Sequence, residues 1–221
     1  PEKTAVFLCR KLNTSETSPL KGHIIVAAQN DNTIEGTAKL RNLDWAVSTA
    51  TIVEGLLRLF SGSPKRDRNI MHRKELGGGR SRELLTDLSI QDKSPLRLQY
   101  IEGNDLLIFT LTKNYLNAVS NILWKDSVNS IIRKTVGIQA IFDILRLICN
   151  EAKQAKDISQ QFFSVKMAPC KDIDFSNTFF EASGRGRQRI RTAIELKLGL
   201  KTLANIDEED AIVYKEVRAV L

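Results

Sequence analysis

Histidine is nearly absent from this sequence, and its scarcity limits the chemistry available to the chain. The 221 residues include only His23 and His72, too few for a metal site built on imidazole or for a Ser/His/Asp catalytic set. The patterns HExxH, GxxxxGKS/T and GxGxxG are missing as well. We therefore expect no metal, no cofactor and no catalytic residue, and we do not expect this chain alone to be an enzyme.

Cysteine and long apolar runs are also scarce. Cys9, Cys149 and Cys170 are too few and too far apart for a disulfide framework or a CxxC metal pair, so we expect three reduced thiols. No apolar run reaches the roughly 18 residues of a membrane-spanning helix, and the first residues lack the features of a secretory signal. These absences favour a cytoplasmic protein that does not enter a membrane.

Basic residues are abundant and are concentrated in two stretches. The net charge of the whole chain is +7. Residues 62–83 carry seven basic and three acidic side chains, and residues 183–191 carry four arginines and no acid, so each stretch has a net charge of +4. The remainder of the chain is therefore slightly negative. Such a local excess of positive charge is typical of a protein with an anionic partner.

Helical periodicity dominates the pattern of apolar residues. Helices are predicted over residues 2–12, 49–60, 106–124, 135–153, 157–167 and 187–199, with a terminal helix starting near the acidic run 206–210. Residues 96–101 are predicted to form a short extended piece. Residues 23–29 and 37–47 flank the turn-forming sequence NDN and predict a small β-hairpin near the N-terminus. The expected fold class is mainly α, α+β at most, in a single helical domain over residues 1–221.

The first basic stretch, residues 62–83, is predicted to be a mobile basic loop within that domain. It contains a proline and three consecutive glycines and has no sustained apolar period. Its candidate anion contacts are Lys65, Arg66, Arg68, Arg73, Lys74, Arg80 and Arg82. Loops rich in lysine and arginine are also common without a partner, so simple solvation is the alternative.

The second basic stretch runs directly into a predicted helix. Its candidate contacts are Ser183, Gly184, Arg185, Arg187, Arg189 and Arg191. The four arginines would cover two neighbouring stripes of the helix. Backbone N–H groups at the helix start, together with the helix dipole, favour an anion there, so the stretch predicts a phosphate clamp. The alternative is that Ser183 caps the helix while the arginines are solvated or pair with acidic residues of the chain.

Four sequence blocks carry a family resemblance: RKLN…SPLKGHI at 10–24, LTKNYLNAVSNILW at 111–124, IIRKTVGIQAIFDIL at 131–145, and FFEASGRGRQRIRTAI at 179–194. Together they resemble the region that follows the signature motif in DGQHR-domain proteins, which include the DndB-like proteins associated with DNA phosphorothioation and restriction. KTVGI followed by an apolar helix is the most specific block. The DGQHR pentapeptide itself is absent, so no catalytic residue carries over, and we expect the C-terminal half of a longer protein.

Two functions of different classes are compatible with these features. The resemblance and the local charge imply a helical module of a DNA-modification or defence protein, which contacts DNA phosphates through the two basic stretches without reading the base sequence. The alternative is a protein–protein docking or oligomerisation scaffold without direct DNA contact. Its first helix and hairpin would bind the missing N-terminal half, another subunit or a second copy of the chain.

Overall fold

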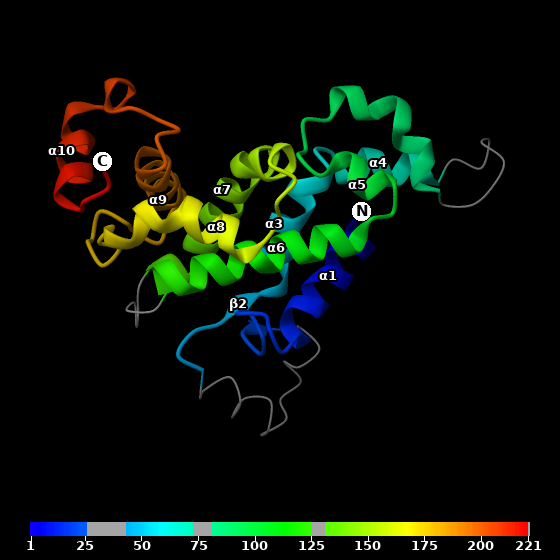
Figure 1. Cartoon of the computed structure of the whole chain (residues 1–221), viewed down its shortest axis with the longest axis horizontal. Coiled ribbons are helices and arrows are strands. Elements are labelled where there is room, and N and C mark those ends of the chain that lie inside the picture. Colours follow the sequence, from blue (N-terminus) through cyan, green and yellow to red (C-terminus); the bar gives the residue numbers. More distant parts are fainter. Residues whose placement is uncertain (26–42, 73–80, 125–130, 221) are drawn as a thin grey trace.

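The structure is a computed structural model that describes residues 1–25, 43–72, 81–124 and 131–220. Most of these residues are helical, which confirms the mainly α fold (Figure 1). The α-helices are α1 (Glu2–Thr14), α3 (Thr49–Phe60), α4 (Pro64–Met71), α5 (Arg97–Ile101), α6 (Asp105–Val119), α7 (Thr135–Gln154), α8 (Gln160–Met167), α9 (Gly184–Lys197) and α10 (Glu208–Glu216). Short 3-10 and π-helical segments are η3 (Arg82–Gln91), η4 (Ser120–Trp124), η5 (Ile131–Arg133), η6 (Ala168–Asp172) and η7 (Leu203–Asn205). Two short strands, β1 (Ile24–Ile25) and β2 (Val47–Ser48), complete the fold.

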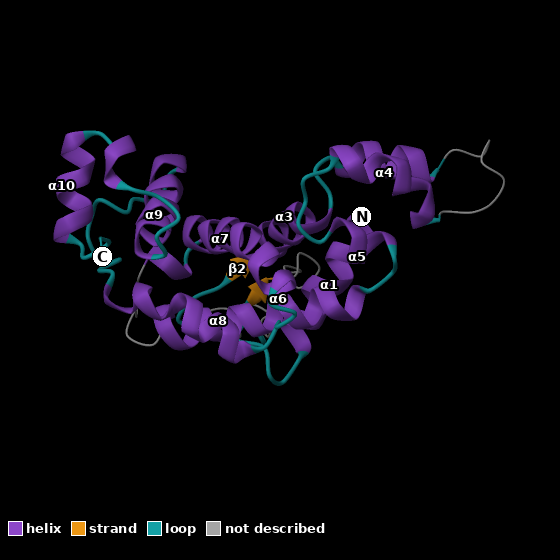
Figure 2. Cartoon of the chain, turned by 45° about the horizontal axis from the view of Figure 1, so that its top comes forward, coloured by secondary structure: helices purple, strands orange, loops and turns teal. Residues whose placement is uncertain are grey.

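The longer helices form two layers, which Figure 2 shows one above the other. Helices α9, α7 and α3 pack side by side in one layer, and α8, α6 and α1 form the other, with α1 also packed against α3. Helix α7 is the centre of the first layer, and its apolar residues Ile138, Ile141, Ile144 and Ile148 are fully buried. It therefore connects the region around α3 to the region around α9. Within the described residues, no helix combines the length and apolar character needed to cross a membrane.

Capping side chains fix where several helices begin. The Ser48 side chain accepts a hydrogen bond from the N–H of Thr51 at the start of α3, and Asn104 accepts one from Leu107 at the start of α6. Each bond satisfies one of the N–H groups that a helix start leaves without an intrahelical partner. The observed starts at Thr49 and Asp105 lie within one residue of the predicted starts at 49 and 106.

The two strands pair near the N-terminus, but the predicted hairpin is wrong because the pairing is parallel, with Ile24 opposite Val47. A two-strand hairpin is antiparallel. The side-chain amide of Asn13, in α1, explains the placement of β1, because it donates to the carbonyl of Ile24 and accepts from its N–H. The Thr49 hydroxyl, at the start of α3, donates to the carbonyl of Ile25. Residues 26–42, most of the predicted hairpin, lie outside the described residues.

The basic stretch 62–83 is not a loop throughout, because α4 occupies residues 64–71. This helix has little apolar face, and it is held instead by Asp67, which is 3% exposed and paired with Arg97. The same pair explains why residues 97–101 form α5 rather than the predicted extended piece. Arg73, Lys74 and Arg80 of the predicted loop lie outside the described residues.

Candidate functional site

Arg187, in the second basic stretch, is held within the fold by a carboxylate of α7. Its Nε and Nη2 atoms each donate to Asp143 over 2.8 Å. Asp143 also accepts a hydrogen bond of 3.3 Å from Arg58 of α3, so one carboxylate connects α3, α7 and α9. Arg187 would have to give up this bidentate contact before it could bind a ligand.

The other arginines of this stretch differ in how far they are engaged. Arg189 donates to Asp210 of α10 over 3.0 Å, and Arg191 donates to Glu195 on its own helix over 2.7 Å. Arg185 is 69% exposed, and its nearest carboxylate oxygen, on Asp210, is 3.9 Å away. Of the four arginines, only Arg185 presents most of its side chain to solvent.

The start of α9 is also satisfied by the chain itself. The Ser183 hydroxyl accepts from the N–H of Gly186 over 3.1 Å and donates to the carboxylate of Glu181 over 2.9 Å. A carboxylate therefore already lies at the position where the helix dipole would attract an anion. A Cβ added at Gly186 would lie 1.7 Å from the carbonyl oxygen of Glu181, whereas a Cβ added at Gly184 would meet no atom within 4 Å. This geometry favours the paired alternative for Arg187, Arg189 and Arg191, and anion contact by this stretch stays a prediction.

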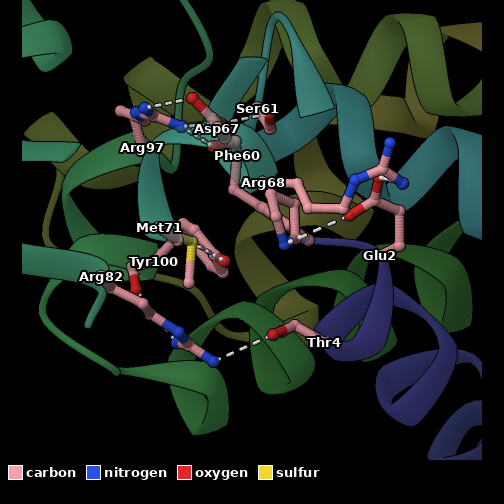
Figure 3. Close-up of polar contacts among 11 residues, drawn as sticks. Glu2, Thr4, Phe60, Ser61, Asp67, Arg68, Met71, Arg82, Arg97 and Tyr100 are labelled. Carbon is pink, nitrogen blue, oxygen red and sulfur yellow. Dashed lines mark hydrogen bonds and ion pairs between the residues drawn. The ribbon is translucent and has the colours of Figure 1, made fainter. Parts of the chain in front are cut away.

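Two basic residues of the first stretch are bound to acidic residues. Figure 3 shows Arg68 beside Glu2 and Arg82 beside Thr4. Arg82 donates to both carboxylate oxygens of Asp105, over 2.6 and 2.9 Å, and to the hydroxyl of Thr4 over 2.9 Å. Its hydrogen bonds to Asp105 raise the pKa of the Arg82 guanidinium. Arg68 lies 3.3 Å from Glu2 and is half exposed. Arg82 therefore supports the packing of η3 on α1 and α6.

A cavity of about 240 Å³ opens beside the start of α4. Three exposed basic side chains line it from different parts of the chain: Arg66 of α4, Lys93 of the segment before α5, and Arg146 of α7. None of the three forms an ion pair with any residue that the structure describes. Lys65, the neighbour of Arg66, is also exposed. The cavity therefore gathers positive charge that the rest of the described chain does not neutralise.

A buried ion pair, drawn in Figure 3, forms the wall of this cavity. Arg97 is 3% exposed, and its two terminal nitrogens donate to the two carboxylate oxygens of Asp67. The Ser61 hydroxyl also donates to Asp67, over 2.6 Å. The Nε atom of Arg97 is buried and has no hydrogen-bond partner among the described residues. One strong donor of Arg97 therefore stays unsatisfied among the described residues, which is rare for a buried polar group.

A second carboxylate, Asp92, also lines the cavity wall. It lies 3.5 Å from Arg97 and accepts hydrogen bonds from the backbone N–H groups of Gly62, over 2.8 Å, and Ser94, over 2.9 Å. Although burial opposes ionisation, these hydrogen bonds lower the pKa of Asp92. Both acidic groups at the cavity are therefore engaged in holding Arg97 and the loop before α4.

The start of α4 differs from the start of α9 in one respect that matters for anion binding. Ser63 is the residue before the helix, but its side chain makes no capping hydrogen bond. Pro64, the first helical residue, has no N–H group. The next N–H groups of the first turn have no side-chain acceptor among the described residues, and Ser63 lines the cavity with the three basic residues. The arrangement suits a small oxyanion.

The sequence predicted this site only in part. Lys65 and Arg66 belong to the predicted basic stretch, but Lys93, Arg97 and Arg146 were missed because none of them belongs to a basic run in the sequence. Arg146 does interrupt the apolar pattern of α7, which is a weak signal for an exposed position. Nothing in the local sequence marks Lys93.

The described residues offer little to nucleophilic or metal chemistry. They contain no group of three or more His, Cys, Asp and Glu side chains that could hold a metal ion. Burial raises the pKa of the Cys9 thiol to about 11, and the pKa values of Cys149 and Cys170 to about 12. All three thiols are free and buried, so none is an activated nucleophile at neutral pH.

Comparisons of this chain with known proteins found no match. No protein-family model matches the chain. No curated protein and no solved structure matches it. The resemblance to DGQHR-domain proteins therefore depends on the four sequence blocks and stays a prediction.

Proposed function

We propose that this chain is a DNA-contacting helical module that binds backbone phosphates at the cavity beside α4. The observation that carries the proposal is the meeting of Arg66, Lys93 and Arg146 around one cavity, without an ion pair to any described residue. Exposed unpaired cations attract phosphates and release counterions on binding. The resemblance to DGQHR-domain proteins, which implies an association with DNA modification or defence, supports DNA as the phosphate-bearing partner.

The second basic stretch has a smaller part in this proposal than the sequence suggested. Arg187, Arg189 and Arg191 are held by carboxylates of the chain, and the α9 start is capped by Ser183. Arg185 is exposed and is the one of the four that can meet a phosphate without breaking a close ion pair. The contacts would be to phosphates, so affinity should depend weakly on base sequence.

The test is binding to duplex DNA across a salt series, with two variants that lose the same charge. One variant carries Arg66→Gln, Lys93→Gln and Arg146→Gln. The control carries Arg10→Gln, Lys171→Gln and Lys215→Gln, which are exposed basic residues of α1, η6 and α10. Each lost phosphate contact lowers the log–log salt slope by about 0.9. We expect a decrease of about 2 to 3 units in the first variant and little change in the control. An equal loss in both would refute a site at α4.

A protein-docking function is the second candidate, and exposed apolar residues favour it. The apolar face of α1 packs on α3, but Phe7 of α1 is 52% exposed and Leu106 of α6 is 68% exposed. The Lys11 ammonium lies 5.6 Å from the ring centroid of Phe7 and 5.0 Å from that of Phe109, one turn after Leu106. A scaffold that self-associates through this surface should sediment as a dimer, and Phe7→Ser with Leu106→Ser should return it to a monomer.

A further inference from the structure

The geometry points to a more specific ligand for the α4 cavity: the terminal phosphate monoester of a nucleic-acid end. This inference rests on the proposed function and narrows it. It depends on the shape of the cavity, on its charge and on its unsatisfied donors, and each of these favours a monoester over a phosphate within a continuous strand.

Shape is the first reason. The cavity of about 240 Å³ is recessed, with the 3%-exposed Arg97 in its wall and contributions from α4, the segment before α5, and α7. A phosphate within a strand has a sugar on both sides, so in a duplex it lies along a surface and meets the rim of such a recess. A terminal phosphate has a sugar on one side only and can enter it.

Charge is the second reason. The residues that line the cavity include four basic side chains, Arg66, Lys93, Arg97 and Arg146, and two carboxylates, Asp67 and Asp92, so the lining carries a net charge of +2. A phosphate monoester carries about −1.5 to −2 charges at pH 7, whereas a backbone phosphodiester carries one. Guanidinium groups bind phosphate oxygens in a bidentate manner, so two arginines and a lysine match the dianion better than the monoanion.

Unsatisfied donors at the start of α4 are the third reason. The Ser63 hydroxyl makes no cap bond to α4, so both this hydroxyl and the first-turn N–H groups are available to an acceptor. A monoester presents three terminal oxygens and a diester only two, so a monoester satisfies more of these donors.

The start of α9 offers less to such a phosphate than the start of α4. At α9, Ser183 provides the cap, Glu181 supplies a negative group, and Arg187 is bound to Asp143. Of the four arginines at the α9 start only Arg185 is largely exposed, whereas the α4 start combines an uncapped first turn with three basic side chains that form no ion pair with any described residue.

The experiment compares one duplex with three kinds of end: 5′-hydroxyl, 5′-phosphate and 3′-phosphate. Fluorescence anisotropy at fixed salt gives the affinities. We expect a phosphorylated end to bind about tenfold more tightly than the hydroxyl end, and the two phosphorylated duplexes show which end enters the cavity. The difference should disappear in Arg146→Gln and in Ser63→Gly, and it should persist in the Arg10→Gln control. Circular dichroism confirms that the variants are folded.

The outcomes separate this inference from the proposed function. One outcome is that all three duplexes bind with equal affinity, while binding still depends on salt and on Arg66 and Arg146. This outcome would refute the end-binding site but would agree with the proposed function. No binding to any duplex would overturn both. Competition with inorganic phosphate and with a nucleoside 5′-monophosphate distinguishes the source of the monoester. If inorganic phosphate alone competes as strongly as the phosphorylated duplex binds, the cavity is a free-phosphate site and the nucleic-acid end is refuted.

Discussion

Arg187 and Arg185 lie two residues apart at the start of α9, yet their replacement by glutamine should affect stability very differently. The Arg187 side chain is 22% exposed and makes two hydrogen bonds of 2.8 Å to Asp143, which is 13% exposed. Arg185 is 69% exposed, and its nearest carboxylate oxygen is 3.9 Å away. An exposed ion pair contributes about 0–1 kcal/mol, and breaking a buried pair costs about 3–5 kcal/mol. The intermediate burial of Arg187 gives a loss of about 2 kcal/mol.

Urea unfolding followed by circular dichroism measures this difference. With a slope of about 2 kcal/mol per molar urea, Arg187→Gln should lower the unfolding midpoint by about 1 M. Arg185→Gln should change the free energy of unfolding by less than about 0.5 kcal/mol, as is usual for an exposed substitution. A double-mutant cycle of Arg187→Gln with Asp143→Asn isolates the pair, and its coupling energy should be at least about 1 kcal/mol.

Two results would refute this reasoning. One is an equal midpoint for the Arg187 and Arg185 variants, and the other is a coupling energy below about 0.3 kcal/mol, within the range of independent sites. Either would mean that Asp143 does not hold Arg187 and that this arginine is free for a ligand. If the prediction holds, replacing all four arginines of the stretch removes stability together with charge. A binding test of the α9 start should then use Arg185 alone.

Three further predictions follow from close contacts and from pKa shifts. Gly186→Ala should destabilise the protein by about 3 kcal/mol or more, because the new Cβ would overlap a backbone carbonyl oxygen at 1.7 Å. Gly184→Ala has open space and should leave the urea midpoint nearly unchanged. The three buried cysteines have pKa values of about 11 to 12. They should resist DTNB at pH 8 in the native protein, and all three should react in urea. Fast labelling of the native protein would contradict their burial. Folding lowers the pKa of Asp92, so the ionised Asp92 stabilises the folded state. This stabilisation is complete above the unfolded-state pKa of about 3.9, and it is lost as the pH falls through the folded-state pKa. Asp92→Asn should therefore flatten the decrease of the urea midpoint below about pH 4, and an unchanged decrease would contradict this role.

Much of the helical fold follows from local sequence, because helix starts and apolar stripes are local signals. Ser48 and Asn104 cap helices that begin within one residue of their predicted starts, and α7 is buried because apolar residues surround most of its circumference. The terminal helix α10 begins within the acidic run that favours a helix N-terminus. These features need no information from distant parts of the chain.

The features that the sequence could not give depend on partners far along the chain. Helix α4 and helix α5 are short, and a buried pair between Asp67 and Arg97 holds both. No local pattern announces a pair that spans 30 residues. The same limit applies to the candidate site. The sequence showed which residues are basic. Only the folded chain shows that Asp143 binds Arg187, while Arg146 forms no ion pair with any described residue.

The parallel pairing of β1 and β2 has a consequence for the order of folding. Ile25 and Val47 are separated by 21 residues, and closing a loop of this length for two paired residues is entropically unfavourable before other contacts exist. Helix α1 precedes β1, helix α3 follows β2, and these two helices pack on each other. Docking of α1 on α3 therefore brings the strands together, and the sheet should form late. Substitutions at Val47 should accelerate unfolding and leave the folding rate almost unchanged, with φ values near zero.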